Sequence, residues 1–173
     1  MITLLATWTF GVTLALTALG VFVSYRLFSF PDITTDGSFT LGAVTTTVLI
    51  VSGYDPAVAT VGGAAAGAAA GACTGLLHAI LGIEPLLSGI LVTTALASVN
   101  LVVLGRSNVP LAGTPTLLDR AEAILLPATT AAGFGEAAGE AARLGVMLAT
   151  VAVAVLLLWA FFRTSLGTAM RAG

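Results

Sequence analysis

The sequence predicts an all-α integral membrane protein, a polytopic helical bundle with about five transmembrane helices. Apolar residues make up 58% of the chain and charged residues only 8%, whereas roughly a quarter of the residues of a soluble domain are charged. The few charges also divide the chain into five long uncharged runs, each close to the roughly 20 apolar residues that a bilayer-crossing helix needs. The lipid bilayer is therefore the expected surrounding.

Composition excludes several classes of function. Six arginines and eight acids give a net charge of −2, so no nucleic-acid partner is expected. Cys73 is the sole cysteine and His78 the sole histidine, which excludes an internal disulfide framework and a histidine or cysteine metal cage. We expect neither a metal nor a cofactor.

The uncharged runs place five spans in a single transmembrane domain over residues 1–173. The first run lacks the charged leader and small-residue cleavage site of a signal peptide, so it is interpreted as a retained span. The second run is marginal in length for a crossing. The expected helices cover residues 3–25, 38–53, 57–81, 86–105 and 142–162.

A polar stretch, Phe30 to Ala43, separates the first two spans. It is either a loop at the bilayer face or irregular backbone inside the bundle. Pro31 should end an arriving helix, and Asp32 or Asp36 can cap a helix that begins near Ser38. A second interpretation makes the polar side chains a gate at the inner end of a pathway. The candidates are Asp32, Thr34, Thr35, Asp36 and Ser38.

The third expected span carries small residues at strict intervals of four. Residues four apart on a helix share a face, and small residues on that face let helix backbones approach closely in lipid. We therefore expect one helix-packing face through most of the bilayer. Its residues are Ala59, Gly63, Gly67, Gly71, Gly75 and Ala79.

Two short turns connect the second, third and fourth spans. Each has a glycine, an acid and then a proline, at residues 53–56 and 82–85. Proline is favoured in the first turn of a helix because its missing N–H is not needed there. Connections this short force antiparallel neighbours, so these spans should form an up-down-up group.

Isolated polar residues in the spans have two interpretations each. Asn100 shares a helix face with Thr93 and Ala97, and it should form an interhelical hydrogen bond or line a pathway. His78 is interpreted as a packing or boundary residue, since a proton relay needs a second titratable group on the same face.

Residues 106–141 form a long, proline-containing polar connection, and Leu117 to Leu126 can make a short interfacial helix in it. Acids at Glu136 and Glu140 favour the start of the fifth helix there. Residues 163–173 begin like a new amphipathic element and stop, so we expect a fragment of a longer protein.

Four motifs, in order along the chain, carry a resemblance to a known family. They are Phe30-Pro-Asp-Ile-Thr-Thr-Asp-Gly-Ser-Phe-Thr-Leu-Gly-Ala43, Glu84-Pro-Leu-Leu-Ser-Gly-Ile-Leu91, Gly105-Arg-Ser-Asn-Val-Pro110 and Leu166-Gly-Thr-Ala-Met-Arg-Ala-Gly173. Together they resemble permease subunits of ABC importers of the branched-chain amino acid and ribose type. Within that type the chain is most similar to the subgroup assigned to tryptophan or other aromatic amino acids.

The resemblance implies a transport subunit rather than an enzyme, forming the translocation pathway for a small polar solute such as an amino acid. The implied partners are a separate ABC ATPase subunit, an extracytoplasmic substrate-binding protein and a second permease copy, identical or different. The implied location is the bacterial inner membrane. Gly167, Arg171 and Gly173 match the start of the cytoplasmic coupling segment that docks on the ATPase.

This implied location of residues 163–173 also sets an orientation. With five spans before it, the N-terminus lies outside, residues 26–36 and Glu84 lie inside, and the connection at 106–141 faces the binding protein.

Two other functions stay open at this point. An ion-coupled secondary transporter would also have a broken helix at Phe30 to Ala43, with Asp32 or Asp36 binding the ion. An intramembrane hydrolase would use the same two acids as a dyad, although no nucleophile motif accompanies them.

Overall fold

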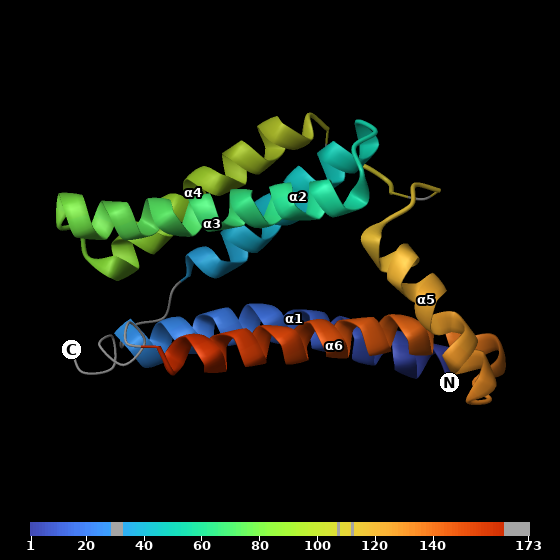
Figure 1. Cartoon of the computed structure of the whole chain (residues 1–173). Helices are drawn as coiled ribbons and strands as arrows, with labels where there is room; N and C mark the ends of the chain where they lie inside the picture. The colour runs from blue at the N-terminus through green and yellow to red at the C-terminus, as the bar shows by residue number, and fades with distance from the viewer. Residues whose placement is uncertain (29–32, 107, 112, 165–173) are drawn as a thin grey trace. The chain divides into compact units, whose positions relative to one another are not determined.

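The computed structural model describes residues 1–28, 33–106, 108–111 and 113–164 (Figure 1). In this part of the chain every regular element is a helix, which confirms the all-α prediction. The elements are α1 Ile2–Phe28, α2 Thr34–Val51, α3 Pro56–Leu81, α4 Pro85–Leu104, α5 Leu117–Ala131, the 3-10 helix η1 Gly135–Ala137 and α6 Ala138–Phe162.

Four stretches of the described chain are long and apolar enough to cross a bilayer. They are Ile2–Arg26, Pro56–Leu81, Pro85–Leu104 and Gly135–Phe162. The second run, which was marginal by length, forms the 18-residue helix α2 but is not among the four. Several apolar helices of this length make the chain a multi-pass membrane protein.

The chain divides into two compact units. One unit contains residues 20–117, with α2, α3, α4 and the end of α1. The other contains residues 1–19 and the chain from 118 onward, with the start of α1, α5, η1 and α6.

Helices α2 and α3 are antiparallel and pack through small residues on both sides. A Cβ atom added to Gly63 would lie 2.5 Å from the carbonyl oxygen of Gly42, and one added to Gly67 would lie 3.2 Å from that of Ser38. One turn after Gly42 on α2, Thr46 Oγ1 donates a hydrogen bond to the carbonyl oxygen of Ala59 at 3.3 Å. The two backbones are therefore close enough that no side chain fits between them at Gly63.

The two predicted turns have the expected local chemistry. The carboxylate of Asp55 accepts a hydrogen bond from the Ala57 N–H at 2.8 Å, with Pro56 in the first turn of α3. Gly82 ends α3 with a φ of 65°, a left-handed conformation that favours glycine. These turns return the chain on itself, so α2, α3 and α4 form the predicted up-down-up group (Figure 1).

The start of α2 differs from the prediction. The helix begins at Thr34 rather than near Ser38, its N-cap residue is Ile33, and the cap makes no side-chain hydrogen bond. Asp36 is thus inside the first turn and is not the cap. Its carboxylate there still interacts favourably with the positive end of the helix dipole. Asp32, the other predicted cap, lies outside the described residues.

The connection between α4 and α6 is more helical than predicted. Helix α5 extends from Leu117 past Pro127 to Ala131. Proline removes one backbone donor, and beyond it the hydroxyls of Thr129 and Thr130 donate to the carbonyl oxygen of Leu126 at 3.0 and 2.9 Å. The last apolar helix, α6, begins at Ala138, between the acids Glu136 and Glu140 and about one turn before the expected start at residue 142.

Candidate functional site

The first turn of α2 lies partway along its neighbours instead of level with their ends. Thr34 Oγ1 is 2.8 Å from Thr74 Oγ1, and Thr74 precedes Leu81, the last residue of α3, by seven positions. On α4, a Cβ atom added to Gly89 would lie 3.4 Å from Thr34 Oγ1. At 1.5 Å per residue these positions set the start of α2 back by about 6–11 Å from the neighbouring helix ends.

Helix α1 also passes the start of α2. A Cβ atom added to Gly20 would lie 3.2 Å from Thr35 Cγ2, and α1 continues for two further turns to Phe28. The first turn of α2 is therefore recessed with respect to α1, α3 and α4. The described part of the stretch Phe30 to Ala43 thus starts a helix partway along its neighbours, and residues 30–32 lie outside the described residues.

The inward side of this first turn is held by hydrogen bonds of hydroxyl groups. Thr34 is 1% exposed and shares its hydrogen bond with Thr74. Thr93 Oγ1 donates to the carbonyl oxygen of Ile33 at 3.2 Å, and Ser38 Oγ donates to that of Thr35 at 3.0 Å. Two of the predicted gate residues, Thr34 and Ser38, thus bind neighbouring parts of the chain.

Asp36 lies on the opposite side of the same turn. Its side chain is exposed and forms no ion pair with a described residue. Thr40, one turn further on, is exposed on the same face and donates to the backbone oxygen of Asp36 at 3.0 Å. The predicted gate set is therefore divided: Thr34 and Ser38 face inward, whereas Asp36 faces outward.

Contacts of Gly37 show how deep Asp36 lies. A Cβ atom added to Gly37 would be 3.5 Å from Thr93 Cα, and Thr93 follows Pro85, the first residue of α4, by eight positions. Asp36 is thus about 12 Å along the axis of α4 from its start. If α4 crosses the bilayer, this depth is close to the middle of a hydrocarbon layer of about 30 Å.

Asn100 occupies the buried face of α4. Its side chain is only 9% exposed, and Oδ1 has no hydrogen-bond partner among the described residues. The predicted interhelical hydrogen bond is therefore not made by this oxygen. Other buried residues of α4, Ser88, Val92 and Leu96, precede it at intervals of four.

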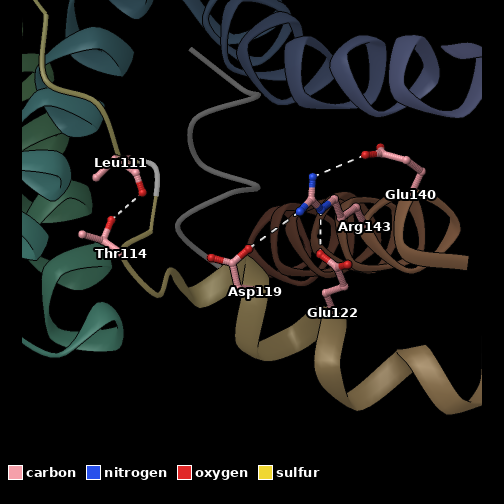
Figure 2. Close-up of polar contacts among 6 residues, drawn as sticks. All are labelled: Leu111, Thr114, Asp119, Glu122, Glu140 and Arg143. Atoms are coloured by element: carbon pink, nitrogen blue, oxygen red, sulfur yellow. Dashed lines mark hydrogen bonds and ion pairs between the residues drawn. The ribbon is translucent and has the colours of Figure 1, made fainter. Parts of the chain in front are cut away.

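In the other unit, Arg143 is the centre of a charged cluster (Figure 2). Its guanidinium lies 2.6 Å from Glu122 Oε2, 3.3 Å from Glu140 Oε1 and 3.9 Å from Asp119 Oδ1. Glu122 and Asp119 belong to α5, so the cluster joins α5 to α6. Glu140 and Arg143 are three residues apart on one helix, whereas the two acids of α5 are more than 20 residues from Arg143 in the sequence. The signal available in the sequence was the pair of acids Asp119 and Glu122, which are three residues apart and precede the helix that carries Arg143.

A glycine lets this cluster form. A Cβ atom added to Gly139 would lie 2.8 Å from Glu122 Oε1, so a larger residue there would displace the carboxylate from Arg143. An open apolar groove of about 420 Å³ also lies between α5 and α6, lined among others by Ile124, Leu125 and Val153.

The predicted glycine face is only half formed. Gly63 and Gly67 lie against α2, but Cβ atoms added to Gly71 or Gly75 would have no atom within 4 Å. The cause is geometric: four residues turn a helix through about 400°, so each step of four rotates the face by about 40°. The contact with α2 moves instead to Thr74, and the buried Ala70 packs in a cluster with Val92 and Leu96 of α4.

The other predicted residues are His78 and those of the segment expected to contact the ATPase. His78 is exposed, and its Nδ1 lies 2.8 Å from the carbonyl oxygen of Ile83 in the turn after α3, as a boundary residue would. No group of three or more metal-binding side chains occurs in the described part of the chain. Gly167, Arg171 and Gly173 lie outside the described residues.

Comparisons with known proteins agree with this architecture. Residues 3–173 match the family described as branched-chain amino acid transport system, permease component, and the chain belongs to this family. It is 34% identical, over 168 residues, to a tyrosine transport system permease protein of Clostridioides difficile (strain R20291). That match covers 97% of this chain and 50% of the relative.

A second relative is an uncharacterized protein of Rickettsia prowazekii (strain Madrid E). It is 35% identical over 101 residues, which are 58% of this chain and 35% of the relative. The chain therefore spans half or less of the length of these curated relatives. No solved structure matches it.

Proposed function

We propose that this chain forms part of the translocation pathway of an ABC importer for an amino acid, in the plasma membrane of a bacterium. Membership of the permease family carries this proposal. The tyrosine transport permease of Clostridioides difficile, similar over 97% of the chain, favours an aromatic amino acid as the solute. The recessed start of α2 also supports it, because many transporters bind their solutes at helix ends that lie within the membrane.

In this proposal the chain carries out no covalent chemistry. A separate ATPase subunit hydrolyses ATP, an extracytoplasmic protein delivers the solute, and a second permease copy completes the pathway. The end of α3 and the start of α4 then face the cytoplasm, and residues 106–141 face the binding protein. Gly167, Arg171 and Gly173 belong to the segment that contacts the ATPase.

The gate, in the same proposal, is the first turn of α2. Asp36 is the member of the predicted set that is exposed on the outward face, and Thr35, Asp32 and Asn100 remain candidates beside it. Thr34 and Ser38 hold the turn in place through their hydrogen bonds.

Reconstitution tests the function. The full-length protein, its ATPase and its binding protein are placed in liposomes, and uptake of labelled tyrosine is measured with ATP inside or outside the vesicles. We expect uptake only when ATP reaches the ATPase and the binding protein is present. Uptake that follows an imposed Na⁺ or H⁺ gradient without ATP would instead identify a secondary transporter.

The gate has its own test in the same system. Asp36→Ala should fold and assemble normally, because the α2 cap is made without this side chain, but it should lose most of its solute uptake. A variant that fails to express would assign Asp36 to folding. Glu84→Ala, which removes an exposed acid before α4, is the matched control and should retain uptake.

A further inference from the structure

The outward face of α2 has one property that the proposed function does not require: it is negatively charged at mid-depth. We propose that Asp36 and Thr40 line a water-filled path, and that the Asp36 carboxylate binds the ammonium group of the transported solute. This inference rests on the proposed function, and it assigns to one residue the recognition of one chemical group.

Asp36 lies partway along the helices that neighbour it. Gly37, the next residue, packs beside Thr93, and α4 extends a further eleven residues beyond Thr93 to Leu104. Thr34, two residues before Asp36, packs beside Thr74, which lies seven residues before the end of α3. Two neighbouring helices thus place Asp36 away from the ends of the spans.

A charge at that depth in a bilayer is energetically costly. A carboxylate at the centre of a bilayer costs about 2.5–3.5 kcal/mol or more when it faces lipid. Asp36 is exposed in this chain and pairs with no described cation, so the three neighbouring helices do not compensate its charge. The positive end of the α2 dipole offsets part of this charge, and the remainder requires water or a positive group.

Most residues on the face of α2 that carries Asp36 are polar. Residues 36, 40, 43 and 47 lie on one side of a helix, and three of them are Asp36, Thr40 and Thr47. Carboxylate and hydroxyl oxygens accept hydrogen bonds from an ammonium group, which has donors and no acceptor. The same face carries no cation, so it is complementary to a positive group and not to a carboxylate.

The experiment measures access and charge without measuring transport. In a Cys73→Ser background, Thr40→Cys is introduced into the assembled full-length transporter, with Asp36 retained or changed by Asp36→Asn. Inside-out and right-side-out vesicles are treated with two thiol reagents of opposite charge: the trimethylammonium-ethyl and the sulfonato-ethyl methanethiosulfonates.

We expect the cationic reagent to react with Thr40→Cys faster than the anionic reagent does. We also expect both reagents to reach this position from the cytoplasmic side. Asp36→Asn should lower the ratio of cationic to anionic rates by about tenfold, the effect of a unit charge about 6 Å away in water on two reagents of opposite sign. Val102→Cys is the matched control, since Val102 is 80% exposed on the apolar helix α4 and should not react.

Protection identifies the bound group. Millimolar L-tyrosine should slow labelling by the cationic reagent, and its deaminated analogue 3-(4-hydroxyphenyl)propionate should not. Slower labelling when Na⁺ replaces choline, with no effect of tyrosine, would overturn the ammonium assignment and point to an inorganic cation. Equal protection by both tyrosine and its analogue would also overturn it.

Two further outcomes would overturn the proposal as a whole. One is a Thr40→Cys protein that reacts with neither reagent, which would place this face against lipid or another helix. The other is a rate ratio unchanged by Asp36→Asn. Because labelling needs no ATP, these results stand apart from the reconstitution: ATP-driven uptake with an unreactive position 40 removes only this inference.

Discussion

The two halves of α3 have the same sequence pattern and different surroundings. Between Ala59 and Gly67 the small residues lie against α2, whereas Gly71 and Gly75 have nothing within 4 Å of an added Cβ. Glycine spacing alone therefore does not define a packing face. The partner's own residues decide it: α2 offers Ser38, Gly42 and Thr46 to the first half only.

The second half still contacts its neighbours, but by a different chemistry. Thr74 binds the hydroxyl of Thr34, and Ala70 joins a small apolar cluster with Val92 and Leu96 of α4. Close backbone approach stabilises one half of the helix, and a buried hydrogen bond with side-chain packing stabilises the other. Substitutions in the two halves should accordingly fail for different reasons.

The largest effect is expected for Gly63→Ala. The new methyl group would lie 2.5 Å from the Gly42 carbonyl oxygen and would also overlap Thr46 Oγ1, and neither helix backbone can move without disturbing the contact. We expect a loss of about 2 kcal/mol in the free energy of unfolding, within the range for overpacked cores. Unfolding followed in detergent measures it. An unchanged stability would mean that α2 and α3 are further apart than described here.

A smaller loss is expected for Thr74→Val, which keeps the shape of the side chain and removes its hydroxyl. The hydroxyl of Thr34, 1% exposed, would lose this partner, at a cost of about 1 kcal/mol. The control is Thr94→Val, since Thr94 is exposed and its hydroxyl donates to the carbonyl oxygen of Ile90 in its own helix. Equal effects of the two substitutions would contradict a special role for the pair of Thr34 and Thr74.

The smallest effect, and of opposite sign, is expected for Gly71→Ala. No atom obstructs the methyl group, and alanine is favoured over glycine in a helix by about 0.5–1 kcal/mol. This chain should therefore become slightly more stable. The same substitution eight residues apart, at Gly63 and at Gly71, is the sharpest test of the difference between the two halves. Destabilisation at both positions would make them one face after all.

Features that depend on neighbouring residues could be predicted from the sequence. The turn at Asp55 and Pro56 and the left-handed Gly82 were recognisable, because a cap and a turn use residues adjacent in the chain. The existence of the apolar helices followed from the distribution of charges.

Features that depend on pairs of residues distant in the chain could not be predicted from the sequence. The start of α2 at Thr34 is supported by Thr74 and Thr93, which come 40 and about 60 residues later. The ion pairs of Arg143 with α5 need a fold that places Glu122 next to Gly139. The single glycine face was wrong beyond Gly67 because a repeat of four is longer than the helical turn of 3.6 residues.

The recessed start of α2 has an electrical consequence. With Asp36 about 12 Å inside a layer of about 30 Å, a cation that moves from the cytoplasmic side to this carboxylate crosses about 0.4 of the membrane potential. At 2.3 kcal/mol per charge and 100 mV, that is about 0.9 kcal/mol for each 100 mV. In the proposed orientation, occupancy of Asp36 by a cation would then depend on voltage: because the cytoplasm is negative, the cation would leave this carboxylate toward the cytoplasm more readily in a strongly energised cell than in a depolarised one.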